Sequence, residues 1–127
     1  LYSGQELPNH KRLQFFEKDP IVWSPECALH NFYKTLFTLK KEHPALAATV
    51  PVTILFADEG QRVLAFARND SGRSVVVVLN FSGEHRSVSL AVQNVGIAKD
   101  AFSGAEVSLS QDSPVEVAPW GFSVFVN

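Results

Sequence analysis

The stretch Ser74-Val75-Val76-Val77-Val78-Leu79-Asn80-Phe81 decides the fold of this chain. Its nearly unbroken apolar residues predict a strand in the middle of a sheet, buried on both faces. One face carries Val75, Val77, Leu79 and Phe81, and the other carries Val76 and Val78. We expect one face to pack between two sheets and the other to pack against a helix or another covering element.

Short strands separated by turn signals surround this segment. Residues 62–69 are predicted as a strand, and the following Asn69-Asp70-Ser71-Gly72 has residue types that favour a tight turn. Further strands are predicted at residues 52 onward, 87–92, 98–102, 106–109, 115–118 and 122–126. About seven or eight short strands with no helix between them predict an antiparallel β-sandwich. We expect Phe122, Val124 and Val126 to face the inter-sheet core, with Trp120 closing its end.

The chain before residue 50 reads as a loop followed by one long helix. Ser24-Pro25-Glu26 has the residue types of a helix start, and Pro44 disfavours helix at His43, so the helix is expected at about residues 26–43. One apolar stripe follows the helical period: Leu29, Phe32, Tyr33, Leu36 and Phe37. This stripe must pack on something large. Thr49-Val50-Pro51 is the expected junction between residues 1–49 and 50–127.

The composition excludes several classes of protein. Apolar residues make up 46% of the 127 residues and charged residues 19%, and the net charge is −2, which lacks the basic excess of a nucleic-acid-binding protein. No apolar run approaches the roughly 18 residues of a membrane span. The single Cys27 excludes an internal disulfide and assigns no compartment. Because the chain starts at Leu1 without an initiator Met, we expect it to be a fragment of a larger protein.

The residues that carry chemistry form no recognisable catalytic or metal site. The acidic residues lie mostly in turns or at strand edges, the four histidines lack metal-ligand spacing, and Cys27 has no base near it in sequence. We therefore expect no catalytic residue, no metal and no cofactor. Exposed aromatic rings could stack on sugars, which makes Trp23 and Trp120 candidate sugar-stacking residues. The alternatives are that Trp23 packs the loop against the helix and that Trp120 lies in the core.

Several segments, in order along the chain, resemble glycoside hydrolase family 13, the α-amylase family. The N-terminal Leu1-Tyr2-Ser3-Gly4-Gln5-Glu6 resembles the Tyr-x-Gly-x-Glu segment that closes barrel strand eight, and residues 39–46, LKKEHPAL, resemble the end of barrel helix eight. Residues 18–23 resemble the loop between them. Residues 63–68, 77–82, 100–104 and 118–122 resemble strands and turns of the C-terminal domain of that family. The resemblance covers nearly the whole chain.

The resemblance implies an amylase-type β-sandwich after a loop and one helix left over from a (β/α)8 barrel. The catalytic acids of the family would lie before Leu1, so the fragment is expected to be inactive, although its parent would be a glycoside hydrolase acting on α-glucans. Because the end of barrel strand eight faces the active site, Tyr2, Gln5 and Glu6 would lie near substrate. Arg12 lies where some members place a sugar-binding arginine. The implied partner is the missing catalytic barrel of the same polypeptide.

Two other functions remain open. A free-standing carbohydrate-binding module would present Trp23 or Trp120 as a ring platform, whereas a structural domain would bury both side chains. A purely structural interaction domain would have no affinity for sugar. In a fragment that lacks its barrel, the apolar helix stripe is expected to fold onto the sandwich, to cause self-association or to stay exposed.

Overall fold

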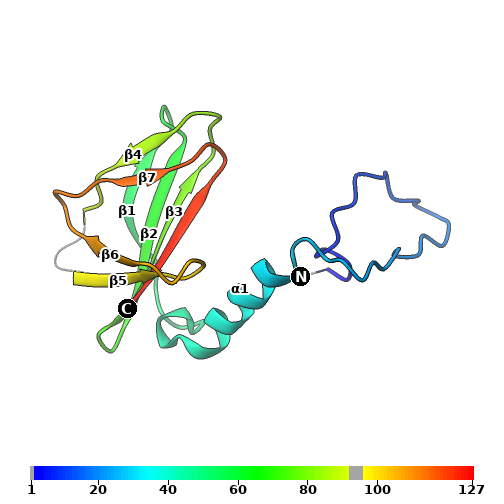
Figure 1. Cartoon of the computed structure of the whole chain (residues 1–127), viewed down its shortest axis with the longest axis horizontal. Coiled ribbons are helices and arrows are strands. Elements are labelled where there is room, and N and C mark those ends of the chain that lie inside the picture. The colour runs from blue at the N-terminus through cyan, green and yellow to red at the C-terminus, as the bar shows by residue number, and fades with distance from the viewer. Residues whose placement is uncertain (1, 92–95) are drawn as a thin grey trace. The chain divides into compact units, whose positions relative to one another are not determined.

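The computed structural model describes residues 2–91 and 96–127, which form two compact units, Leu1–Thr38 and Leu39–Asn127 (Figure 1). Leu1, and Val92 of the strand predicted at 87–92, lie outside the described residues. The first unit contains a loop and the larger part of helix α1, His30–Glu42. No helix in the described ranges has the length and apolar character that a membrane crossing requires.

Helix α1 begins later than its sequence predicts. The side-chain oxygen of Ser24 accepts a hydrogen bond from the backbone N–H of Glu26 at 3.1 Å, and this local turn takes the place of a helix cap. The first backbone bond of helical spacing runs from Tyr33 N to Leu29 O at 3.0 Å. The C-terminal end agrees with the prediction, because His43 is extended (φ −92°, ψ 117°) before Pro44. A short 3-10 helix, η1, Pro44–Leu46, follows.

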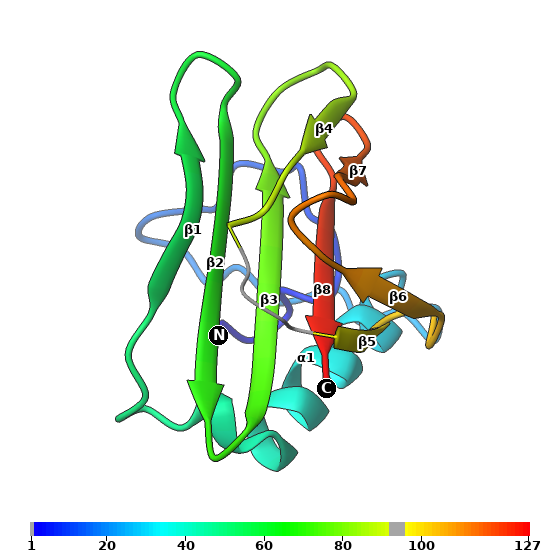
Figure 2. The ribbon, with the colours of Figure 1, turned by 90° about the vertical axis from the view of Figure 1, so that its left-hand side faces the viewer.

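In the described part of the second unit, eight strands follow. They are β1 Thr53–Asp58, β2 Val63–Asp70, β3 Arg73–Asn80, β4 Arg86–Val88, β5 Gly96–Asp100, β6 Glu106–Leu109, β7 Val115–Val117 and β8 Phe122–Val126. A six-stranded sheet has the order β1-β2-β3-β8-β5-β6, and β4 pairs with β7 in a second, two-stranded sheet. All pairs are antiparallel. Figure 2 shows β1, β2, β3 and β8 side by side. The predicted antiparallel sandwich is confirmed.

The hairpin of β2 and β3 ends in the predicted tight turn. Asp70 pairs with Arg73, and the two residues between them, Ser71 and Gly72, have φ angles of 51° and 79°. Positive φ at both central residues matches the right-handed twist of the flanking strands. The turn therefore fixes the register that places Val76 and Val78 on the same face as Ala65 and Ala67.

The core lies between the two sheets. Val76 and Val78 of β3 are 1% and 0% exposed, and they pack in one cluster with residues from both sheets. That cluster contains Val63, Ala65, Ala67, Val76, Val78, Val88, Leu90, Ala98, Leu109, Val115, Val117 and Phe125. The buried Asn80 joins the layers, because its Nδ2 donates to the carbonyls of Val117 and Ala118 at 3.3 and 2.9 Å.

The opposite side of the six-stranded sheet, here called the outer face, is covered at one end only. Val75 and Val124 pack there against Ala45, which is fully buried, and against neighbouring side chains of residues 39–46. Arg68, also on this face, donates hydrogen bonds from Nη2 to the carbonyls of Ala47 and Val50. The segment that follows α1 is thereby held on the sheet.

Two predictions about burial are wrong. Leu79 is only half-buried and Phe81 is 51% exposed, so the outer face of the central strand is not covered along its whole length. Strand β8 also presents the opposite face to the core. Val78 pairs with Ser123 and Val76 with Phe125, so these β8 residues share the inner face, whereas Val124 packs on the outer face. Alternation along a strand makes one residue of register decide this outcome.

Candidate functional surface

The predicted substrate-side residues lie in a turn at the start of the chain. Gln5 N donates to Tyr2 O at 3.1 Å, and Tyr2 N donates to Oε1 of Gln5 at 3.2 Å. The turn brings Tyr2 and Gln5 together, and within it the side-chain oxygen of Gln5 accepts the hydrogen bond from the Tyr2 backbone. The Tyr2 side chain is 76% exposed. Nearby, the Cys27 thiol donates to the carbonyl of Glu6 at 3.1 Å, which ties the turn to the segment before α1.

A hollow of about 470 Å³ lies beside α1 within the first unit. Glu6 lines it together with Tyr33 and Phe37 of the predicted apolar stripe, and with His30, Lys34 and Thr38. None of the residues of α1 is buried, and Phe37 is 51% exposed. The rings of Tyr33 and Phe37 stack with centroids 6.2 Å apart. The apolar stripe of the helix is therefore only half covered by the described residues.

The loop that carries Arg12 contains one ion pair. Lys11 Nζ lies 2.6 Å from Oδ1 of Asp19, and the backbone N–H of Gln14 donates to Oδ2 at 3.0 Å. The hydrogen bond from Lys11, followed by the one from Gln14, lowers the pKa of Asp19. Arg12 itself is exposed in the same loop. Among the described residues, Arg12 and Tyr2 make no hydrogen bond or ring contact with each other.

The aromatic side chains of this loop are exposed. Phe15 and Phe16 are 88% and 94% exposed and pack edge-to-face on each other at 4.7 Å. Trp23 is 63% exposed, which does not favour the alternative that it packs the loop against the helix. Two adjacent apolar residues in a loop have no second layer of structure to bury them. The strands later in the chain do, because two sheets pack on each other there.

Trp120 does not close the core. It sits in the turn between β7 and β8 with φ 54°, and its side chain is 70% exposed. Its backbone N–H donates to the carbonyl of Ser82 at 2.9 Å, which holds the turn against the end of β3. Gly121 is required next to it, because a Cβ there would approach the carbonyl oxygen of Ala118 to 2.8 Å. The left-handed backbone at Trp120 is a constrained conformation for a bulky residue.

Trp120 and three exposed Phe side chains belong to the uncovered end of the sheet. Phe122 is 43% exposed, pairs with Leu79 across β3, and contacts Phe102 edge-to-face at 5.1 Å. Phe81 continues the same strand beyond Leu79 and donates its backbone N–H to Arg62 O. We call Phe81, Phe102, Trp120 and Phe122 the aromatic patch. Sequence reasoning missed it, because three of its members were assigned to the core.

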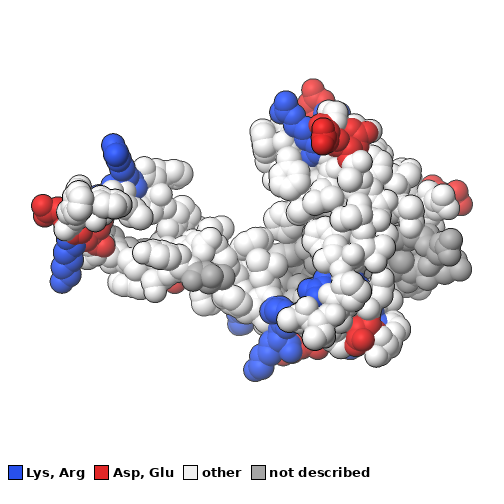
Figure 3. Space-filling model, turned by 180° about the vertical axis from the view of Figure 1, so that it is seen from behind, with Lys and Arg blue, Asp and Glu red and all other residues white. Residues whose placement is uncertain are grey.

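The aromatic patch continues into a wider apolar surface on the outer face. Strand pairing sets Leu64 beside Leu79 and Phe66 beside Val77, and all four side chains are half-buried. In Figure 3, the charged side chains of the sandwich gather toward its ends, and uncharged surface lies between them. A half-buried apolar sheet face with an exposed aromatic end is typical of an interaction surface.

The described residues contain no group of three or more His, Cys, Asp or Glu side chains that could hold a metal ion. The two-layer antiparallel sandwich after one helix has the architecture of an amylase-type C-terminal β-domain. The family model described as Maltogenic Amylase, C-terminal domain, matches residues 52–124. The chain belongs to this family, which forms the C-terminal part of α-amylase family enzymes.

Similar proteins are much longer than this chain. The α-amylase MalA of Haloarcula japonica is 29% identical over 98% of the chain, which covers 19% of MalA. The crystal structure of trehalulose synthase MutB from Pseudomonas mesoacidophila MX-45 is 25% identical, with a TM-score of 0.59, over 76% of this chain and 17% of MutB. A MutB mutant in complex with glucose matches with a TM-score of 0.60 over 78% of this chain and 18% of that one. The chain thus spans about a fifth of the relatives it matches.

Proposed function

We propose that this chain is the non-catalytic C-terminal part of a longer α-glucan-active glycoside hydrolase, and that it packs against and stabilises the catalytic barrel. The observation that carries the proposal is the uncovered apolar outer face of the six-stranded sheet, ending in the aromatic patch. In this proposal residues 1–49 complete the last β/α unit of the barrel, and residues 50–127 form the domain that covers its flank.

The energetics favour a partner for the outer face. Burying apolar surface contributes roughly 25 cal/mol per Å², so covering one Phe side chain contributes about 1.5–3 kcal/mol. Phe81 and Phe122 are 51% and 43% exposed, and much of that contribution remains available to a partner. At the other end of the same face, Ala45 packs on Val75 and Val124. Ala45 lies outside the strands of the sandwich, so this contact is an example of how another segment can cover the sheet.

The helix supports the same proposal independently. Leu29, Phe32, Tyr33 and Leu36 are half-buried, and the described part of the chain does not fully cover any of them. An amphipathic helix gains most of its stability from packing its apolar face. In the longer polypeptide this face would rest on barrel strands and neighbouring helices. In the isolated chain the same face favours self-association.

Tyr2, Gln5, Glu6 and Arg12 would then belong to the barrel side of the molecule. Their place at the start of the chain, before the helix, fits a position at the carboxyl end of the last barrel strand. We propose that they line the rim of the substrate site, where the exposed Tyr2 ring and the Arg12 side chain are available to an α-glucan.

A paired substitution tests the docking proposal. In the longer polypeptide, Phe122→Ser should lower the melting temperature by several degrees more than it does in the isolated chain, because it also removes apolar contact with the barrel. The matched control is the same substitution in the isolated chain, which has no barrel contact to lose. An equal melting temperature for Phe122→Ser and for the unsubstituted enzyme would contradict docking through this face.

The second candidate is a carbohydrate-binding module, and the exposure of Trp120 favours it. A ring that is 70% exposed on a rigid turn has the accessibility that stacking on a sugar requires. A glycan array probed with the chain separates the two functions. Binding to α-glucans that Trp120→Ala or Trp23→Ala abolishes would support the module. Absence of any glycan binding, together with the loss of stability in Phe122→Ser, would support the docking domain.

A further inference from the structure

Trp120 occupies a turn position that favours other residues. The turn runs from Ala118 to Gly121, since the backbone N–H of Gly121 donates to the carbonyl of Ala118 at 2.9 Å. Pro119 takes the second position, and Trp120 takes the third with φ 54°. Pro at the second position and positive φ at the third are the features of a type II turn, which favours Gly or Asn at that third position. A bulky residue is strained in this left-handed conformation.

Contacts within the domain cover only a small part of the ring. The Trp120 side chain is 70% exposed. Its indole Nε1 lies over Gly83, where an added Cβ would be 3.6 Å away, so this edge of the ring rests on the loop after β3. Most of the ring surface is exposed, and its burial in the domain therefore does not offset the strain of the turn.

Two other non-glycine residues among those described have positive φ, and both suit it better. Ser71, with φ 51°, stands in the β2–β3 hairpin turn, where the turn type requires positive φ. Arg62, with φ 56°, is an exposed polar residue between β1 and β2. Trp120 combines the same conformation with a large exposed apolar side chain. Backbone strain with no gain inside the fold is typical of a functional residue.

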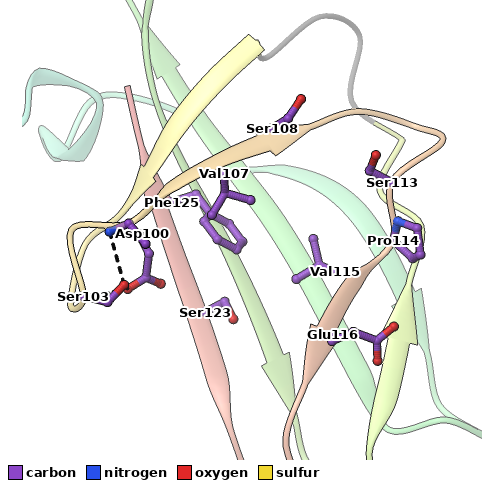
Figure 4. A pocket seen from close by; sticks show the side chains of 11 residues that line it. Asp100, Ser103, Val107, Ser108, Ser113, Pro114, Val115, Glu116, Ser123 and Phe125 are labelled. Atoms are coloured by element: carbon purple, nitrogen blue, oxygen red, sulfur yellow. Dashed lines mark hydrogen bonds between the residues drawn. The ribbon is translucent and has the colours of Figure 1, made fainter.

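The ring belongs to the outer side of the sheet. On the inner side of β8, Ser123 and Phe125 line a cavity of about 340 Å³ together with Val115 of β7 (Figure 4). Phe122 alternates with them and pairs with Leu79 at the uncovered end of the outer face. The exposed Trp120 ring therefore adds to the surface that the proposed docking uses.

The surroundings of the ring favour a protein partner over a sugar chain or a charged ligand. The rings of Phe102 and Phe122 lie at 70° to each other, so they do not form the flat platform on which a sugar chain stacks. Arg86 Nη2 lies 2.8 Å from Oε2 of Glu84, so these neighbouring charges require no oppositely charged partner. A large aromatic side chain on a rigid turn, beside other apolar rings, is typical of an anchor residue in a protein interface.

We propose that Trp120 is the anchor residue of the docking surface, and that its ring fills an apolar pocket on the catalytic barrel of the same polypeptide. The inference rests on the proposed function, and it adds which residue contributes most to docking and what kind of pocket receives it. The length of the relatives supports the barrel as the occupant, because the chain covers only 19% of MalA and 17% of MutB. The rigid turn lowers the entropy that the ring loses on docking.

Replacing Trp120 by asparagine tests the proposal, because asparagine suits the third position of the turn and lacks the ring. In the isolated chain, Trp120→Asn should raise the melting temperature by about 2–4 degrees, since it relieves the strain. In the longer polypeptide, the same substitution should lower the melting temperature by several degrees, since the anchor is lost. Opposite signs in the two molecules are the expected result.

Two further variants serve as controls. Ser71→Asn places the same residue at another left-handed position, in the hairpin turn, and should raise the melting temperature of both molecules. Trp120→Phe keeps an apolar ring on the strained turn. The longer polypeptide with Trp120→Phe should therefore retain most of the stability that Trp120→Asn removes.

Two results would overturn the proposal. An equal shift of the melting temperature by Trp120→Asn in both molecules would mean that the ring has no pocket on the barrel. A lower melting temperature of the isolated chain would mean that the ring stabilises the sandwich itself. Docking would survive either result if Phe122→Ser destabilises the longer polypeptide more than the isolated chain, and it would fail together with the anchor if Phe122→Ser shifts both equally.

Discussion

Asn80 is the residue on which the two layers of the sandwich depend most directly. It is 3% exposed, and its amide donates to Glu84, Val117 and Ala118 carbonyls while its oxygen accepts from Ser82. Backbone carbonyls before β4 and at the end of β7 therefore share one buried amide donor. A buried carbonyl without a donor is costly, so this side chain specifies the junction as well as stabilising it.

Replacing Asn80 by alanine should destabilise the domain by about 2–4 kcal/mol, because several buried polar groups lose their partners at once. Ser89→Ala, at an exposed position, should change stability by about 0.5 kcal/mol or less. Urea denaturation of both variants measures the difference. Equal midpoints would show that water replaces the Asn80 amide without loss.

The Lys11–Asp19 contact gives a prediction about pH. The pKa of Asp19 is lowered in the folded chain, first by the hydrogen bond from Lys11, relative to its ordinary value of 3.8. A lowered carboxyl pKa favours folding of the loop above the unfolded pKa, and this contribution is lost as the pH falls through the folded pKa. Lys11→Met should therefore raise the pKa of Asp19 toward 3.8. Carboxyl carbon shifts followed by nuclear magnetic resonance below pH 5 measure it; an unchanged titration would mean that Gln14 alone sets the pKa.

At the scale of the element, β8 shows that predicting which residues form a strand does not predict which of its faces packs on the core. The sequence Phe122-Ser123-Val124-Phe125-Val126 predicts a strand, and the strand occupies those residues. Its face could not be read from hydrophobicity, because Phe122, Val124 and Val126 outnumber Phe125. Pairing with β3 decides the face, and it sets Phe125 opposite Val76 in the core.

The two phenylalanines of β8 should respond differently to truncation. Phe125→Ala removes a ring that is 5% exposed and should cost about 3–5 kcal/mol, whereas Phe122→Ala removes a ring that is 43% exposed and should cost about 1 kcal/mol. Chemical denaturation of the two variants compares them under one condition. A larger loss of stability for Phe122→Ala than for Phe125→Ala would mean that Phe122, and not Phe125, faces the core.

The same limit explains what else the sequence could predict. Local signals were sufficient for the Ser71-Gly72 turn, for the end of α1 before Pro44 and for nearly every strand. Local signals were not sufficient for features that depend on contacts with residues far away in the sequence. Trp120 points outward because its backbone bonds to Ser82, and Phe81 is exposed because its segment lies beyond the cover of residues 39–46. The residues of the aromatic patch are apolar, like those of the core. Only the pairing of the strands decides which of these apolar residues are exposed.

At the scale of the whole molecule, the proposed function makes the chain one part of a longer enzyme. It covers 17–19% of the relatives it matches, and the acids that the α-amylase resemblance requires are not carried by its motifs. The sandwich supplies a scaffold, an apolar face and a small cavity. A retaining glycosidase needs two carboxyl groups about 5–5.5 Å apart across a sugar site.

The purified chain should release no reducing sugar from starch or from maltose. A colorimetric reducing-sugar assay over a long incubation checks this, with heat-treated chain as the blank. Activity that co-purifies with the chain through a second column, and that persists in Tyr2→Phe, would contradict the prediction. Activity that separates from the chain would identify a contaminant.

Arg68 and Ala45 carry a consequence for where the domain can be cut. The family match starts at residue 52, yet the carbonyls that Arg68 binds and the alanine that covers Val75 lie between residues 45 and 50. A truncated chain starting at Val52 should unfold about 2–4 kcal/mol more easily than one starting at Leu39, because Val75 is uncovered and Arg68 loses both acceptors. Thermal unfolding of the two truncations would measure this. We therefore expect the cooperative folding unit of the domain to extend beyond the family match, back to Leu39 in the last turn of the helix.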